Sequence, residues 1–190
     1  MSVLRRATCF SIALAVGQLA AASDPLRAAA HEGSHASVAK SSPLIEKVRQ
    51  ATRRYRDVNV AIAEQWVQGT PCVSGPNEGA MGVHFVLPAR IGDGEVRADE
   101  PEALIYEPTA GGELRLVGVE FIVLAADWAA RHPNGSTPSV DGHLMHYVGA
   151  PNRYGLPAFY EIHVWAWEGN PKGSFADWNT RVSCDRQAAD

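Results

Sequence analysis

Short apolar runs separated by turn-forming residues are the feature of this sequence that most restricts its fold. Each run is rich in β-branched and aromatic residues, and glycine, proline and asparagine gather between the runs, which is typical of antiparallel strands. The runs cover residues 81–87, 103–107, 114–124 and 159–167. The second and third are joined through Gly111 and Gly112, which predicts a β-hairpin. We therefore expect a mainly β (α+β) domain built on an antiparallel barrel or a sandwich-like sheet.

One N-terminal amphipathic helix is expected before these strands. Ser42-Pro43 has the form of a helix start, because proline is favoured at the first helical position. Apolar residues then recur every three or four positions and form a stripe that must pack against another element. They are Leu44, Val48, Ala51, Tyr55, Val58, Ile62 and Trp66. The other face is basic, and we interpret it as solvated because the formal net charge of the chain is −4, so no nucleic-acid partner is indicated.

The first residues of the chain have the layout of a secretory signal peptide. Arg5 and Arg6 precede an apolar run, and small residues follow up to Ala22. The apolar run is shorter than the roughly 20 residues that span a bilayer, so no membrane span is expected in the mature chain. We predict a signal peptide, a flexible linker and a single globular domain that is secreted or periplasmic; their ranges are 1–22, 23–41 and 42–190.

The cysteines support a secreted or periplasmic location. The chain has three, of which Cys9 lies in the predicted signal peptide. Its removal leaves Cys72 and Cys184, an even number in an oxidising compartment. A disulfide bond between these two is the favoured interpretation, and a pair of thiols that binds copper or zinc is the alternative.

One metalloprotease motif occurs in the predicted linker. His31-Glu-Gly-Ser-His35 matches the H-E-x-x-H pattern, which requires both histidines on one face of a stable helix. Gly33 and Ser34 are poor helix formers, so we do not expect that helix or a protease.

Ionisable residues inside the predicted strands are the main indication of chemistry. His84 and Glu120 have apolar neighbours, and Glu161 and His163 lie two positions apart, hence on one face of a strand. A carboxylate buried alone is strongly destabilising, and an ion bound by carboxylates and imidazoles would offset that. The predicted metal ligands are His84, Glu107, Glu120, His146, Glu161 and His163.

The same residues have an interpretation without an ion. One face of an antiparallel sheet is often solvated, in which case Glu161 and His163 face water. Glu120 then pairs with Arg115, and His84 is a hydrogen-bonded structural residue. Both interpretations stay open at this point.

Two further features lie close to the predicted ligands. The glycine- and proline-rich stretch 133–157 is interpreted as an ordered functional loop or a lid. Trp165 and Trp167 are expected on the strand face of Glu161 and His163, where they either line a pocket or fill the core.

Five segments resemble a family of small exported bacterial proteins that has no assigned activity. They cover 80–86, 101–108, 114–121, 149–167 and 170–184, and the last, Asn-Pro-Lys-Gly-Ser-Phe-Ala-Asp-Trp-Asn-Thr-Arg-Val-Ser-Cys, is the most specific. The resemblance implies an exported single domain and carries no reaction with it. Leu87 stands where the family pattern has asparagine and Thr180 where it has proline, so no ligand-binding role is expected of position 87.

Two functions of different classes follow. In the first, an exported soluble domain binds a divalent metal ion (Zn, Cu, Mn or Fe) through His and Glu side chains in a β-sheet pocket. In the second, a non-catalytic exported module binds a small ligand or an envelope protein.

Overall fold

The computed structural model describes residues 42–187, and every structural statement below concerns this part of the chain. The predicted signal peptide, the linker and the His31–His35 motif lie outside the described residues. The helices are α1 (Pro43–Thr52), the 3₁₀ helix η1 (Arg53–Arg56), α2 (Val58–Ala63), α3 (Pro88–Ile91) and α4 (Ala125–Arg131). None of them combines the length and apolar character needed to cross a bilayer.

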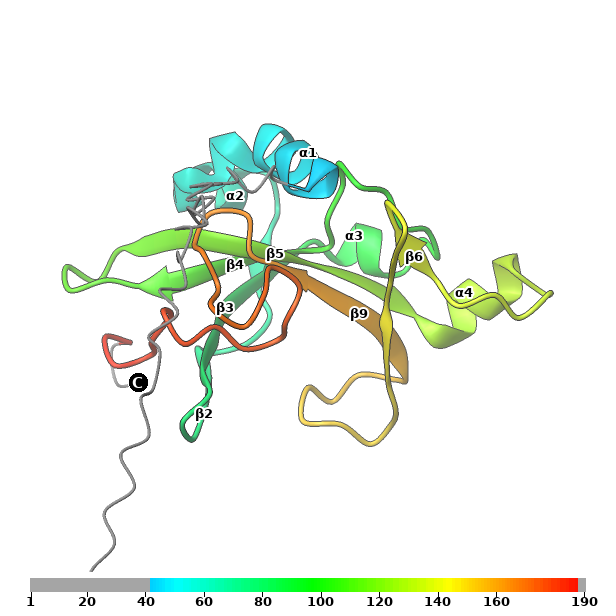
Figure 1. Cartoon of the computed structure of the whole chain (residues 1–190). Helices are drawn as coiled ribbons and strands as arrows, with labels where there is room; N and C mark the ends of the chain where they lie inside the picture. The colour runs from blue at the N-terminus through cyan, green and yellow to red at the C-terminus, as the bar shows by residue number, and fades with distance from the viewer. Residues whose placement is uncertain (1–41, 188–190) are drawn as a thin grey trace, which may run out of the picture. The chain divides into compact units, whose positions relative to one another are not determined.

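Most of the strands pair in one antiparallel sheet. The strands are β1 (Val67–Gln68), β2 (Val73–Gly75), β3 (Gly79–Val86), β4 (Ala103–Pro108), β5 (Leu114–Leu124), β6 (Ser139–Val140), β7 (His143–Leu144), β8 (His146–Val148) and β9 (Phe159–Val164). The main sheet has seven strands in the order β1-β3-β4-β5-β9-β8, with β2 pairing β3 outside this path, while β6 and β7 form a separate pair (Figure 1). The predicted hairpin is confirmed as β4 and β5.

The sheet is not closed into a barrel. Its two edges are β1 and β8, which are two and three residues long and do not pair with each other. Closure needs a continuous hydrogen-bonded register around the sheet, and such short edges cannot supply it. Of the two predicted forms, the structure therefore shows the sandwich-like α+β one.

Helices α1 and α2 cover one face of the sheet (Figure 1). On this face Phe85 of β3, and Val119 and Phe121 of β5, form one core cluster with Leu44 and Val48 of α1. All five are buried, so the apolar stripe of α1 packs where the 3.6-residue period predicted.

The predicted single helix is interrupted after Thr52. The chain tightens into η1, and Asp57 then starts α2 because its side chain accepts a hydrogen bond from the backbone N–H of Asn59 at 3.0 Å. The interruption turns Ile62 out of the stripe, and it is 51% exposed, whereas Tyr55 and Trp66 stay buried.

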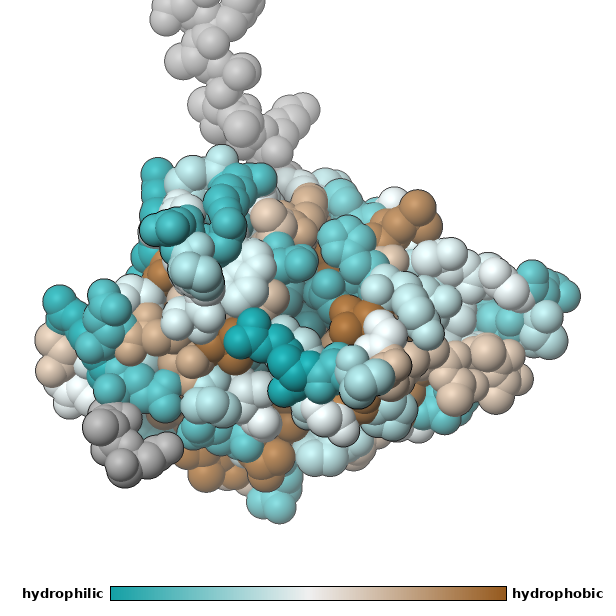
Figure 2. All heavy atoms as spheres, turned by 90° about the horizontal axis from the view of Figure 1, so that it is seen from below, coloured by the Kyte–Doolittle hydropathy of each residue, from teal (hydrophilic) through white to brown (hydrophobic). Residues whose placement is uncertain are grey.

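The opposite face of the sheet is covered by irregular chain. Tyr154 and Leu156, from the loop before β9, pack against a buried cluster of Ala103, Ile122 and Phe159. The C-terminal segment lies on the same side of the sheet as that loop (Figure 1). Seen from this side, hydrophilic and hydrophobic residues are interspersed over the surface (Figure 2). This second layer is built mainly from loops.

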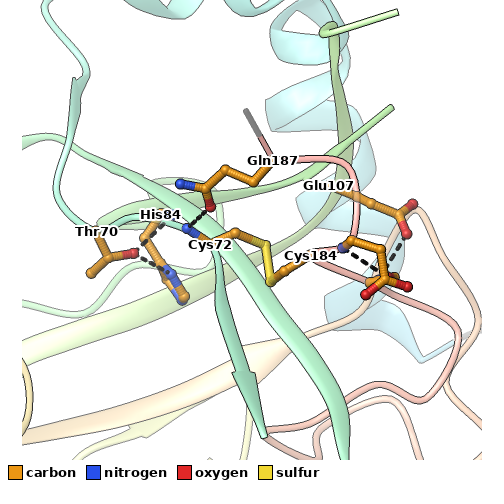
Figure 3. The surroundings of a disulfide bond; sticks show 8 residues. Thr70, Cys72, His84, Glu107, Cys184 and Gln187 are labelled. Carbon is orange, nitrogen blue, oxygen red and sulfur yellow. Dashed lines mark hydrogen bonds between the residues drawn. A yellow bond between two sulfur atoms is a disulfide. The ribbon is translucent and has the colours of Figure 1, made fainter. Parts of the chain in front are cut away.

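The predicted disulfide bond is confirmed between Cys72 and Cys184 (Figure 3). It joins residues 112 positions apart, with 5.6 Å between their Cα atoms. The backbone N–H of Cys72 also donates to Oε1 of Gln187. The bond therefore attaches the end of the chain to the segment that connects β1 and β2.

The predicted loop 133–157 is only partly irregular. Strands β6, β7 and β8 all lie within it, and β8 pairs with β9 at the edge of the main sheet. Residues 133–138 and 149–157 are irregular, and the second of these segments packs over the face opposite α1 through Tyr154 and Leu156.

Candidate metal centre

Three ionisable side chains from three strands meet on the loop-covered face of the sheet. Glu120 of β5 and His163 of β9 are directly paired across neighbouring strands. Strand β4 lies between β5 and β3, which carries His84. The β4 residue paired with Glu120 is Ala103. His84 itself pairs with Ile105 of β4, two residues from Ala103, so its ring reaches Glu120 diagonally across β4. We call His84, Glu120 and His163 the inner group.

The inner group has the spacing of a metal site. Nε2 of His84 lies 3.4 Å from Oε2 of Glu120, and one ligand atom from each of the three residues lies within 4.8 Å of the others. Two ligands about 2.1 Å from a tetrahedral ion are about 3.4 Å apart, so small side-chain rotations would bring all three into place. The three residues are between 2% and 6% exposed.

Each imidazole of the inner group is oriented through its Nδ1 atom. Nδ1 of His84 lies 3.1 Å from the Thr70 hydroxyl, which also accepts the His84 backbone N–H at 3.3 Å. Nδ1 of His163 lies 3.0 Å from Oε2 of Glu161. Both contacts direct Nε2 to the interior of the group, and Nε2 of His163 is buried there without a hydrogen-bond partner. Histidine ligands of metal ions are oriented in this way, so the residues fit an ion.

The electrostatics of the inner group follow from the burial of three ionisable side chains close to one another. Burial, together with the neighbouring His163, lowers the pKa of His84 to about 3, so this imidazole is neutral at neutral pH. Burial also raises the pKa of Glu120, with help from the carboxylates of Glu161 and Asp177. For His163, burial acts to lower the pKa, but Glu120 and Glu161 outweigh it and raise the value to about 9.

No lysine or arginine of the described chain forms an ion pair with Glu120, Glu161 or Asp177. These carboxylates are therefore compensated by protons, on histidine or on the carboxylates themselves, or by a bound cation.

A second set of ligand atoms lies beside the first. Nδ1 of His146 is 3.6 Å from Oε1 of Glu161 and 3.7 Å from Oδ1 of Asp177. One ligand atom from each of these residues again lies within 4.8 Å of the others. We call His146, Glu161 and Asp177 the outer group, because the His146 side chain is 62% exposed.

A small cavity of about 110 Å³ adjoins the inner group, and His84 and Glu120 form part of its wall. The rest of the wall is largely apolar, with Ile122, Phe159 and Leu156 among its residues. Tyr154 also lines it, and burial and the nearby Glu120 raise the pKa of its hydroxyl to about 12. A molecule of a few non-hydrogen atoms fits this volume.

The structure divides the predicted ligands among three places. His84, Glu120 and His163 meet in the inner group, and His146 and Glu161 belong to the outer group. Glu107 lies apart from both.

Glu107 is four residues beyond Ala103 along β4, a distance of about 13 Å. It forms an ion pair with Arg115, and its Oε1 accepts the backbone N–H of Ser183 at 2.9 Å. Glu107 and His84 are drawn on opposite sides of the disulfide bond (Figure 3). Strand alternation predicts the face of Glu107 but not which residues of the neighbouring strands lie beside it.

The interpretation without an ion disagrees with the structure in two respects. Glu161 and His163 are buried, with 5% and 2% exposure, and do not face water. Arg115 pairs with Glu107 and Glu168 instead of Glu120.

The two tryptophans of the predicted strand face lie on different sides of the sheet. Trp165 is buried and its ring is stacked near His163, with 6.1 Å between ring centroids. Strand β9 ends at Val164, so the alternation stops before Trp167, whose indole N–H donates to the Thr52 hydroxyl of α1. Trp165 therefore supports the inner group, and Trp167 belongs to the helix-covered core.

Thr70, Tyr154 and Asp177 were not predicted from the sequence. All three lie in irregular segments, where no periodicity indicates a side-chain direction. Comparison with known proteins adds no further residue: no family model matches the chain, and neither a curated protein nor a solved structure matches it.

Proposed function

We propose that this chain is an exported protein that binds one divalent transition-metal ion in the inner group. The ligands are Nε2 of His84, a carboxylate oxygen of Glu120 and Nε2 of His163. The buried Nε2 of His163 carries the proposal, because it faces a second imidazole and a carboxylate and has no hydrogen-bond partner. Zn²⁺ suits two nitrogens and one oxygen, and Cu, Fe and Mn ions also accept this donor set.

Three protein ligands leave at least one coordination position for water or for a small ligand. The cavity beside His84 and Glu120 is where such a ligand fits. A metal in this setting supplies Lewis-acid chemistry, namely polarisation of a bound oxygen or activation of water. The apolar residues Ile122, Leu156 and Phe159 would shield that position from bulk water.

Secretion or a periplasmic location is part of the same proposal. The Cys72–Cys184 bond supports an oxidising compartment, and the predicted signal peptide and the family resemblance agree with it.

A second candidate function is the binding of a small apolar ligand without a metal. The observation that favours it is the cavity itself, with Ile122, Leu156 and Phe159 in its wall. Under this alternative the inner group is a buried hydrogen-bonding network, and a partner in the envelope could supply the ligand.

The test is metal stoichiometry. The mature chain is purified without an affinity tag, stripped with a chelator, titrated with Zn²⁺ and analysed for metal after desalting. We expect Glu120→Gln to bind one equivalent less than wild type, because the amide keeps the shape and loses the charge. Glu113→Gln is the matched control, since Glu113 is exposed in the β4–β5 turn. Equal stoichiometry in wild type and a folded Glu120→Gln variant would overturn the proposal in favour of the second candidate.

A further inference from the structure

The outer group brings together three ligands from separate parts of the fold. His146 of β8 and Glu161 of β9 are a directly paired cross-strand couple, and Asp177 comes from the C-terminal segment. The separations of 3.6 and 3.7 Å from Nδ1 of His146 to the two carboxylate oxygens are too long for hydrogen bonds. They are close to the separation of about 3.4 Å between two ligands of one ion.

Both carboxylates of the outer group have an oxygen that makes no hydrogen bond within the described residues and has only histidine side chains as ion-pair partners. The Glu161 side chain is only 7% exposed, and its Oε2 contacts His163, whereas its Oε1 has no hydrogen bond within the described residues. Oδ1 of Asp177 is buried and also has none. A buried carboxylate oxygen without a donor, such as Oδ1 of Asp177, is strongly destabilising unless a cation or a proton compensates it.

We infer that the outer group binds a second divalent cation, next to the one proposed for the inner group. One imidazole nitrogen and two carboxylate oxygens suit Zn²⁺ or Mn²⁺. The exposure of His146 leaves solvent access for water ligands and for exchange of the ion. The outer site stands on its own observations, whereas its coupling to the inner ion rests on the proposed function.

Glu161 couples the two sites. Its Oε2 contacts Nδ1 of His163, and its Oε1 faces the outer group, so one carboxylate serves both. A cation on Oε1 withdraws negative charge from Glu161 and makes His163 a weaker ligand. The two cations also repel each other. Each ion therefore weakens the binding of the other, by the same factor in both directions.

Substitution of His84 or His146 by alanine removes one ligand from one group only. It therefore distinguishes binding at the two sites without changing the formal charge of the ligand set. In a Zn²⁺ titration of the chelator-stripped mature chain, we expect two equivalents in wild type, one in His146→Ala, one in His84→Ala and none in the double variant. His143→Ala, three positions from His146, is the matched control and retains two equivalents. Asp177→Asn is a second variant of the outer site and is expected to bind one equivalent.

The possible outcomes distinguish the two proposals. If wild type binds one equivalent that His146→Ala and Asp177→Asn both retain, the outer site is overturned. If that equivalent is lost in these two variants and kept in His84→Ala, the outer site stands and the inner one fails. The coupling predicts at least fivefold tighter Zn²⁺ binding to the outer group in His84→Ala than in wild type with the inner group filled. Equal affinities overturn the coupling.

Discussion

The two faces of the central sheet are built by the same strands and have opposite chemistry. On the face under α1, residues such as Phe121 and Val119 pack into a continuous apolar core. On the other face, Glu120 and His163 are also buried, although they are ionisable. Successive side chains of a strand point to opposite faces, so Glu120 and Phe121 are chain neighbours in two different environments.

The two faces make opposite contributions to the free energy of unfolding: the face under α1 stabilises the fold, and the buried carboxylates of the other face oppose folding. Apolar burial under α1 stabilises the domain by about 25 cal/mol for each Å² removed from water. Burial of the carboxylates on the other face opposes folding unless protons or cations compensate them. A group of residues held together against that penalty is a candidate for function, since packing alone does not require it.

The largest expected effect comes from the apolar face. Phe121→Ala removes a fully buried ring and should lower the free energy of unfolding by about 3–5 kcal/mol. Because Phe121 points away from the inner group, Zn²⁺ stoichiometry should not change in the folded variant. Urea unfolding and metal analysis check both statements, and a loss of bound Zn²⁺ in the folded variant would show that the two faces are not independent.

Substitution of Glu120, the chain neighbour of Phe121, should change metal binding and should not lower the stability of the metal-free chain. Without metal, Glu120→Gln removes a buried charge and should leave the free energy of unfolding equal to or higher than that of wild type. Zn²⁺ at about 100 times its dissociation constant should stabilise wild type by about 2.7 kcal/mol per bound ion, and Glu120→Gln by one ion less. Unfolding curves with Zn²⁺ and with chelator measure this difference, which Glu113→Gln should not alter.

A smaller effect is expected from the residue that orients His84. Thr70→Val keeps the side-chain volume and removes the hydroxyl that lies 3.1 Å from Nδ1 of His84. Loss of such an orienting partner weakens metal affinity about 10- to 100-fold. Competition with a chromophoric chelator gives the affinity, and Thr109→Val on the β4–β5 turn is the control. An unchanged affinity would mean that packing alone orients the His84 ring.

The smallest effect concerns a buried carboxylate outside both groups. Oε2 of Glu102 accepts the backbone N–H of Ile122, and burial raises the pKa of Glu102 to about 9. The folded chain thus keeps a proton that the unfolded chain releases near pH 4.5. The free energy of unfolding of wild type therefore decreases as the pH rises from about 4.5 to about 9. Compared with wild type, Glu102→Gln should become progressively more stable as the pH rises, by about 1 kcal/mol from pH 5 to pH 6.

Urea unfolding in chelator at pH 5 and pH 6 tests this prediction. Because the quantity compared is the difference between Glu102→Gln and wild type, groups that titrate equally in both cancel. A difference that does not change with pH would mean that Glu102 is ionised in the folded protein.

Strand alternation was enough to predict much of this arrangement from the sequence. It indicated that Glu161 and His163 share a face, and the hairpin of β4 and β5 followed from the two glycines of its turn. The pairing of Cys72 with Cys184 followed from the count of cysteines expected in the mature chain.

Other features depend on information that the sequence pattern lacks. Register determines which residues of neighbouring strands lie side by side, and the sequence pattern does not give it. Glu107 was therefore grouped with residues that it does not approach. The predicted single helix is interrupted because the Asp57 side chain caps a new helix, α2. The periodic spacing of apolar residues does not indicate such a local cap. Thr70 and Asp177 reach the site from irregular segments that tertiary contacts position.

The spacing of the inner ligands along the chain has a consequence for the order of events in the cell. His84, Glu120 and His163 are 36 and 43 positions apart, so nothing in a nascent polypeptide holds them near one another. Motifs with closely spaced ligands can capture an ion before they fold, but this arrangement exists only after β3, β5 and β9 have assembled. The choice of metal would then be made from the ions present where the chain finishes folding, and not where it is synthesised.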